Sequence, residues 1–127
     1  MNDKELYGIA VQAMARAYAP YSNFRVGAAL LTEDGRVFTG VNVENATYGA
    51  TICAERTAIV KAVSEGASGF VKIAVASSGG KAMPCGICRQ VLAEFARDIE
   101  VLTGDDAEHV EQYRLAELLP YSFELER

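Results

Sequence analysis

Cys53-Ala54-Glu55 and Pro84-Cys85-Gly86-Ile87-Cys88 decide how this 127-residue chain is interpreted. Together they supply three thiols and one carboxylate, a set that suits a zinc ion activating a water molecule. In a catalytic zinc site, three protein ligands leave the fourth tetrahedral position open for water, whereas a structural site closes with a fourth protein ligand. The sequence has no fourth cysteine, and its single histidine, His109, lies in a polar stretch near the C-terminus. The pattern therefore predicts one catalytic zinc ion.

The same cysteines have simpler interpretations. A C-x-x-C pair such as Cys85 and Cys88 also occurs as a redox pair or as half of a zinc ribbon. An isolated buried cysteine is usually a small apolar core residue. The combination of this pair with Cys53, Glu55 and the preceding Pro84 favours the catalytic site, with Cys53, Cys85 and Cys88 as the metal ligands.

Length and composition indicate a single globular domain over residues 1–127, with 50% hydrophobic and 23% charged residues. The net charge of −5 disfavours nucleic acid as a partner, because phosphate binding needs a basic surface. No apolar stretch is long enough to span a membrane, and the charged N-terminus does not resemble an export signal. The odd number of cysteines, three, favours a reducing cytoplasm over a disulfide framework. We therefore expect a cytoplasmic protein that binds a small metabolite.

Hydrophobic periodicity predicts an α/β fold. Helices are expected over residues 3–18, 53–65, 86–97 and 115–119. Strands are expected over residues 26–32, 36–43, 70–77, 99–103 and 109–114. Pro20 is expected to end the first helix, and Asp34-Gly35 to turn a hairpin between the first two strands. This order of elements gives a three-layer α-β-α sandwich around a five-stranded mixed sheet.

The predicted helices place the cysteines at helix N-termini. Cys53 begins one helix, while Cys85 and Cys88 begin another, and the partial positive charge at such termini favours thiolate over thiol. Three thiolates on Zn²⁺ leave a net charge of −1, which opposes ionisation of a bound water. Arg56, three residues after Cys53, is placed to offset this charge by hydrogen-bonding a ligand sulfur. The alternative is that Arg56 is a solvated surface residue.

Glu55 is predicted to be the catalytic acid–base group. Two residues from Cys53, it does not share the direction of that ligand, but it can reach water on the metal. The spacing of Cys53, Glu55 and the Pro84-Cys85-x-x-Cys88 motif is typical of zinc-dependent nucleobase deaminases. Hydrolytic deamination needs a proton moved from zinc-bound water to the ring nitrogen, and then a proton for the departing ammonia. The simpler interpretation, an acidic residue favoured in the first turn of a helix, does not account for its pairing with three cysteines.

Four further segments carry a family resemblance: residues 19–30, Gly40 to Ala46, Pro84 to Val91 and Glu117 to Pro120. With the Cys53 helix, they make the chain closely similar to the small homotetrameric cytidine deaminases of pyrimidine salvage over nearly its whole length. The resemblance implies one zinc per subunit. It implies a hydrolase acting on a cyclic amidine, in which zinc-bound water attacks C4 of cytidine or 2′-deoxycytidine. The products are uridine or 2′-deoxyuridine and ammonia.

The resemblance also implies substrate contacts. Asn42 and Glu44 would hydrogen-bond the ribose 3′-hydroxyl, with Glu44 also contacting the amide edge of cytosine, and Phe24 would lie against the base or sugar. Asn42 and Glu44 stand two apart on a predicted strand, so their side chains share one face. An exposed strand face, and core packing for Phe24, are the alternatives. The remaining substrate-binding residues implied are Ala46, Tyr48, Ala54 and Phe123.

The implied assembly is a homotetramer with active sites shared between subunits. Ala46 and Tyr48 would approach the 5′-hydroxyl from a neighbouring subunit, and Phe123 would stack on the base in a neighbour's site. Docking of Phe123 on its own chain is the alternative. Three other functions remain open: deamination of a modified cytosine nucleoside, nucleic-acid editing, and a non-catalytic zinc or redox module. The acidic balance disfavours editing.

Overall fold

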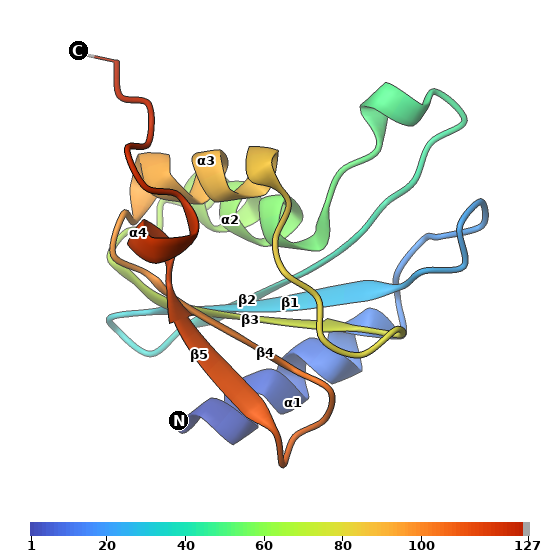
Figure 1. Ribbon diagram of the computed structural model, residues 1–127, viewed down its shortest axis with the longest axis horizontal. Helices are drawn as coiled ribbons and strands as arrows, with labels where there is room; N and C mark the ends of the chain where they lie inside the picture. Colours follow the sequence, from blue (N-terminus) through green and yellow to red (C-terminus); the bar gives the residue numbers. More distant parts are fainter. Residues whose placement is uncertain (126–127) are drawn as a thin grey trace.

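The computed structural model describes residues 1–125 of the 127-residue chain. Its elements follow the predicted order, with one additional 3₁₀ turn, η1 (Figure 1). The helices are α1 (Asp3–Met14), α2 (Ala54–Ser64), α3 (Gly86–Phe95) and α4 (Leu115–Leu118), and η1 is Tyr48–Ala50. The strands are β1 (Val26–Thr32), β2 (Val37–Val41), β3 (Phe70–Ser77), β4 (Glu100–Gly104) and β5 (Val110–Arg114).

The five strands form one mixed sheet in the order β2-β1-β3-β4-β5. Only β3 and β4 pair in parallel, and the helix α3 connects them, whereas the other neighbouring pairs are antiparallel. Helix α1 covers one face of the sheet, and α2, α3 and α4 lie on the other (Figure 1). The predicted three-layer sandwich is therefore confirmed. Within residues 1–125, no helix combines the length and the apolar character needed to cross a membrane.

Strand alternation divides the core between the two faces. In β1, Ala28 and Leu30 join the cluster beneath α2 and α3, whereas Ala29 between them joins the cluster beneath α1. This follows from the two-residue period of a strand, which sends neighbouring side chains to opposite faces. Both faces of the central strands are therefore buried, and each layer of helices has its own apolar contact with the sheet.

Three predicted boundaries are wrong by two residues or more: the helix predicted over residues 86–97 ends at Phe95, and the other two share one cause. The first helix ends at Met14 rather than residue 18, well before Pro20, and the second strand ends at Val41 rather than residue 43. The reason is a tertiary pairing: the Tyr18 N–H donates to the Asn42 carbonyl at 3.0 Å, and the Glu44 N–H donates to the Tyr18 carbonyl at 2.8 Å. Because these bonds require extended backbone, the chain leaves the helical conformation before Tyr18. The strands 26–32 and 70–77 have the predicted bounds, and the other elements begin and end within two residues of theirs.

Candidate metal centre and substrate site

The three cysteines meet between α2 and α3. Their Sγ atoms all lie within 4.8 Å of one another, and those of Cys53 and Cys85 are 3.6 Å apart. Cys53 is the N-cap of α2, Cys85 is the N-cap of α3, and Cys88 lies in the first turn of α3. The exposure falls from Cys85, which is exposed, through Cys53 to the fully buried Cys88. The predicted position of the cysteines at helix N-termini is therefore confirmed, and the two termini meet.

The donor set fits a zinc ion. With Zn–S bonds of about 2.3 Å and tetrahedral angles, ligand sulfurs stand about 3.8 Å apart, close to the Cys53–Cys85 separation. Thiolate is the ligating form, so a thiol that ionises readily favours binding. A hydrogen bond from Cys88, reinforced by Cys85 and the charge of Arg56, lowers the pKa of Cys53 to about 6. The same bond and burial raise the pKa of Cys88.

Contacts of Cys88 and Arg89 fix the start of α3. The Cys88 N–H points at the Cys85 sulfur, 3.5 Å away, as a helix N-terminus presents its free amides to an anion. Arg89, next to Cys88, donates to the carbonyls of Pro84 at 2.7 Å and Leu118 at 2.8 Å. Arg89 therefore ties the loop before α3 to the end of α4. The geometry of the C-x-x-C turn is held by the protein itself.

Glu55 lies in the first turn of α2 and is only 4% exposed. Burial, together with the nearby charge of Cys53, raises the pKa of this carboxyl to about 7, against the opposing effects of a backbone hydrogen bond and Arg56. Glu55 is not part of the three-residue ligand group. A buried carboxyl beside a thiol cluster, with a pKa close to neutrality, can both accept and donate a proton.

Arg56 does not make the hydrogen bond expected from the sequence. Within residues 1–125 it has no bond to a cysteine sulfur; its Nη2 instead donates to the Thr51 carbonyl at 3.0 Å. Its Nε is buried and has no partner in the same part of the chain. Its positive charge nevertheless lowers the pKa of Cys53. Arg56 therefore acts on the cluster through charge, and a buried N–H remains available there.

Asn42 clamps the chain before β1. Its Nδ2 donates to the Phe24 carbonyl at 2.8 Å, and its Oδ1 accepts from the Val26 N–H at 2.9 Å. The side chain is buried, with 9% exposure. Because an amide has two N–H donors and an oxygen with two lone pairs, one donor and one acceptor remain for another partner.

Glu44 is held by the segment Tyr21–Ser22, which sequence reasoning did not single out. Its Oε1 accepts the N–H groups of Tyr21 at 2.9 Å and Ser22 at 3.1 Å, and its Oε2 accepts the Ser22 hydroxyl. These bonds, led by that of the Ser22 hydroxyl, lower the pKa of Glu44. The signal in the sequence was a serine inside the motif that contains Phe24, but nothing in the sequence paired it with Glu44.

The segment containing Asn42 and Glu44 lies beside the start of α2. Val43 and Ile52 exchange two backbone hydrogen bonds of 3.0 Å each, which pairs this segment with the residue just before Cys53. The residues between them form a projecting arm, residues 42–52, that carries η1 away from the body of the molecule (Figure 1). The structure thus brings the Asn42–Glu44 segment to the metal helix, although β2 has already ended.

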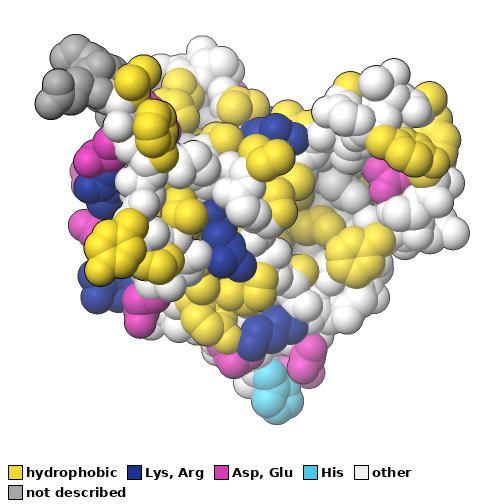
Figure 2. Space-filling model, turned by 45° about the horizontal axis from the view of Figure 1, so that its top comes forward, with side chains coloured by type: hydrophobic (Ala, Val, Ile, Leu, Met, Phe, Trp, Pro, Cys, Tyr) yellow, Lys and Arg dark blue, Asp and Glu magenta, His cyan; other side chains and the backbone are white. Residues whose placement is uncertain are grey.

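The remaining predicted residues divide into two groups. Ala54 is fully buried at the start of α2, and Phe24 is 45% exposed with its ring against Gly79, where a Cβ would stand 2.7 Å from Cε2. Ala46, Tyr48 and Phe123 are exposed and lie outside the thiol group. Hydrophobic side chains gather at the outer end of the projecting arm (Figure 2), where the rings of Tyr21 and Tyr48 meet edge to face.

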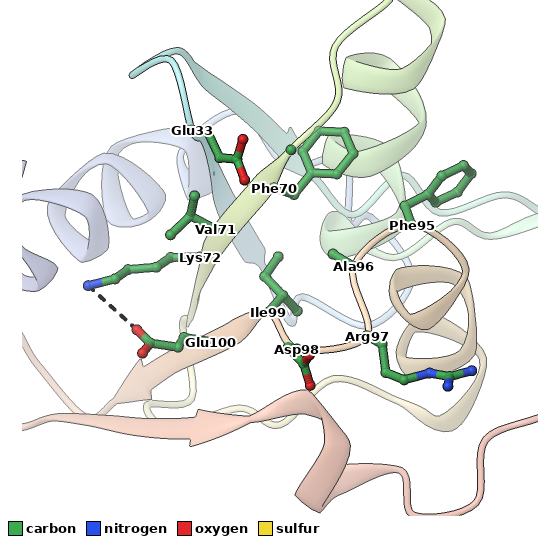
Figure 3. Close-up of a pocket in the computed structure, with 11 residues that line it drawn as sticks. Glu33, Phe70, Val71, Lys72, Phe95, Ala96, Arg97, Asp98, Ile99 and Glu100 are labelled. Atoms are coloured by element: carbon green, nitrogen blue, oxygen red, sulfur yellow. Dashed lines mark ion pairs between the residues drawn. The ribbon is translucent and has the colours of Figure 1, made fainter.

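A separate cavity lies away from the thiols. It has a volume of about 510 Å³ and lies between the start of β3 and the connection from α3 to β4 (Figure 3). Its lysine, Lys72, is already paired with Asp3 at 2.6 Å and Glu100 at 3.5 Å. With its lysine satisfied and no cysteine in its lining, it offers no comparable chemistry.

Comparison with known proteins supports the zinc site that the three cysteines indicate. The model of the cytidine and deoxycytidylate deaminase zinc-binding region matches residues 1–103. A curated cytidine deaminase from Halalkalibacterium halodurans is 48% identical over 128 aligned positions, covering 99% of this chain and 97% of the relative. Another from Mycobacterium tuberculosis is 48% identical, covering 95% of this chain and 89% of the relative.

Solved structures agree. A cytidine deaminase from Burkholderia pseudomallei superimposes with a TM-score of 0.92 at 46% identity, covering 97% of this chain and all of the other. One from Mycobacterium tuberculosis gives a TM-score of 0.86 at 43% identity, covering 98% and 99% of the two chains. The match extends over the sheet, the helices and the zinc-binding region, and this chain therefore belongs to the cytidine and deoxycytidylate deaminase family.

Proposed function

We propose that this chain is a zinc-dependent cytidine deaminase, which hydrolyses cytidine to uridine and ammonia, and 2′-deoxycytidine to 2′-deoxyuridine and ammonia. The observation that carries the proposal is the meeting of three cysteine sulfurs at two helix N-termini, with the buried Glu55 beside them. The named relatives, all cytidine deaminases, support the choice of substrate.

Cys53, Cys85 and Cys88 would hold the zinc ion. When bound there, the ion supplies a Lewis acid that lowers the pKa of water toward neutrality. Glu55 takes a proton from the attacking water as the C4–O bond forms, and delivers it to N3 of the pyrimidine. It then passes the second proton of the water to the departing amino group, so that the C4–N bond breaks with ammonia as the product. Arg56 offsets the negative charge of the three thiolates.

Asn42 and Glu44 would bind the sugar. Asn42 keeps one amide N–H and one acceptor site free after clamping the backbone at Phe24 and Val26. Glu44 is a carboxylate with a lowered pKa, so it accepts a hydrogen bond from the ribose 3′-hydroxyl. The Phe24 ring would lie against the nucleoside, and Ala54 would line the base pocket at the start of α2.

The first experiment measures ammonia release from cytidine and 2′-deoxycytidine by the zinc-loaded protein, beside the variant Glu55→Gln. The amide keeps the shape of the side chain but cannot move the proton. We expect turnover to fall by about three orders of magnitude or more, with zinc content and nucleoside binding retained. Mass spectrometry of metals and equilibrium dialysis of nucleoside provide those two readouts.

Glu65→Gln is the matched control, because Glu65 is exposed at the opposite end of the same helix. It should turn over cytidine as the parent does. Undiminished turnover in Glu55→Gln would overturn the proton-transfer role. A zinc-loaded parent that releases no ammonia from either nucleoside would overturn the substrate, and modified cytosine nucleosides would be tested next.

We also propose a homotetramer in which Ala46, Tyr48 and Phe123 complete neighbouring active sites. All three are exposed on the single chain, Tyr48 by 77% and Phe123 by 71%. Light scattering should give four times the chain mass. Mixing Phe123→Ala with Glu55→Gln after dissociation should restore activity, since an intact Glu55 site can then receive Phe123 from the other variant. Two inactive variants that stay inactive in mixed tetramers would contradict site sharing.

Two further assignments belong to the same proposal. Residues 1–127 would form one deaminase domain, as the single five-stranded sheet supports.

The protein would work in the cytoplasm in pyrimidine salvage, where three reduced thiols remain available as metal ligands. Alkylation of intact cells followed by mass spectrometry would test this, because zinc-bound thiols resist the reagent until the metal is chelated.

A further inference from the structure

The turn before β1 links two proposed substrate residues through one hydroxyl. The Ser22 Oγ accepts the Phe24 N–H at 3.0 Å and donates to the Oε2 of Glu44. Between Ser22 and Phe24, Asn23 has a left-handed φ of 60°, and its N–H returns to the Ala19 carbonyl at 3.0 Å. Asparagine tolerates this conformation better than most residues, so the turn is sharp and defined.

The bonds around Glu44 determine where its free lone pair points. A carboxylate has about four acceptor sites, and the N–H groups of Tyr21 and Ser22 together with the Ser22 hydroxyl occupy three of them. One site remains for a further donor. Ser22 and Glu44 also line one cavity of about 320 Å³, together with Tyr21, Asn45, Tyr48 and Thr51.

Phe24 is held at three points, one of them by this turn. Its N–H is held by Ser22, its carbonyl by Asn42, and its ring lies against Gly79. A hydroxyl is required at position 22 because it must accept from Phe24 and donate to Glu44 at once. Alanine does neither, whereas threonine retains both functions.

We propose that Ser22 is a positioning residue, which aims the Glu44 carboxylate at the 3′-hydroxyl of the nucleoside while fixing the backbone of Phe24. The inference rests on the proposed function, in which Glu44 and Phe24 contact the substrate. Ser22 touches neither the reacting atoms nor the zinc ligands, so its effect belongs to binding. The hydrogen bond from Ser22 also lowers the pKa of Glu44, which keeps the carboxylate an acceptor.

The test compares Ser22→Ala, Ser22→Thr and the parent with cytidine. Losing a hydrogen bond to a charged group should raise KM by about tenfold in Ser22→Ala, with kcat within about twofold of the parent. Ser22→Thr should return KM to within about threefold of the parent value. The matched control is Ser78→Ala, which likewise loses one bond to a backbone N–H, that of Arg25 at 3.0 Å, but has no bond to Glu44. It should keep KM within about threefold.

A substrate lacking the 3′-hydroxyl separates positioning from general loosening. With 3′-deoxycytidine the parent already lacks the partner of Glu44, so Ser22→Ala should raise KM by about threefold or less, which is the part that comes from Phe24. An equal KM increase with cytidine and 3′-deoxycytidine would overturn the inference, as would an unchanged KM in Ser22→Ala. A parent without cytidine turnover would instead contradict the proposed function, so the two failures are distinguishable.

Discussion

On both faces of the sheet a helix packs closely over a strand glycine, but only one of these helices carries site residues. On one face, α1 crosses β1 at Gly27, where a Cβ would stand 2.2 Å from the Ala10 carbonyl oxygen. On the other, α2 crosses β2 at Gly40, where a Cβ would stand 2.4 Å from the Ala54 carbonyl oxygen. Both helices thus approach the sheet so closely that only a strand residue without a side chain fits beneath them.

The N-termini of these two helices differ. Helix α1 begins with a capping box, in which Asn2 and Glu5 bond each other's backbone N–H groups at 2.8 and 3.0 Å. Helix α2 begins at Cys53, whose side chain makes no capping bond, and buries Glu55 in its first turn. One helix satisfies its own terminus and contributes stability, while the other leaves its terminus to a ligand. Of these two helices, the one whose N-cap side chain makes no capping bond is the one that carries a metal ligand and the buried Glu55.

The largest expected effect comes from removing a cysteine ligand at a helix N-terminus. Cys88→Ala should abolish stoichiometric zinc binding and lower turnover by about a thousandfold or more, because two thiols do not complete the site. Metal analysis and ammonia release measure both. The control is Ile87→Ala, at the neighbouring exposed position, which should keep one zinc per chain. Full zinc content in Cys88→Ala would contradict the ligand assignment.

Substitution of Gly27 and Gly40 tests the close helix–strand packing on the two faces. Gly27→Ala and Gly40→Ala should each lower the free energy of unfolding by about 1–3 kcal/mol, since a methyl group forces helix and strand apart. Only Gly40→Ala should also lower zinc affinity and kcat, because it displaces the helix that carries Cys53 and Glu55. Urea denaturation and metal titration give the two readouts.

Gly8→Ala is the control for this pair, because a Cβ at this position in α1 meets nothing within 4 Å. It should raise the free energy of unfolding by about 0.5–1 kcal/mol, as expected for replacing a helical glycine. Equal losses of zinc affinity in Gly27→Ala and Gly40→Ala would show that the two faces are not functionally distinct.

A smaller effect is expected at the cap of α1. Asn2→Ala removes the acceptor for the Glu5 N–H and should lower the free energy of unfolding by about 1 kcal/mol. Turnover at 25 °C should stay at the parent value, because the cap lies on the face opposite to the thiols. A thermal melt and an activity assay suffice, and a fall in kcat without a fall in melting temperature would refute this separation.

The smallest effect concerns an exposed charge. A hydrogen bond to Asp106 raises the pKa of His109, whose side chain is 75% exposed. The pair of protonated His109 and Asp106 therefore stabilises the folded state below the ordinary histidine pKa. This stabilisation is lost as pH rises through the raised pKa. NMR titration of this single histidine should show the raised pKa, which Asp106→Asn and high salt should both lower. A pKa insensitive to both changes would exclude the ion pair as its cause.

Much of the fold and the metal centre could be predicted from local sequence. The apolar runs in residues 26–32 and 70–77 indicated two strands with their observed bounds, since a short apolar run between turn residues is typical of a strand buried on both faces. The cysteines were placed at helix N-termini because helix starts also have local signals. The end of α1 at Met14 was missed, because a pairing of Tyr18 with a segment far along the chain overrides helix propensity.

The chemistry of the donor set therefore lies in the sequence: three cysteines, a glutamate two residues after the first, and the helices that carry them. The long-range partners depended on the folded chain. Ser22 meets Glu44 because this bond depends on how two loops dock against one another. The Arg56 contact is local, with the Thr51 carbonyl just before α2, but spacing alone did not distinguish it from a bond to a ligand sulfur. Local propensity and spacing describe neighbours along the chain, whereas contacts such as that of Ser22 with Glu44 follow from register and packing between distant segments.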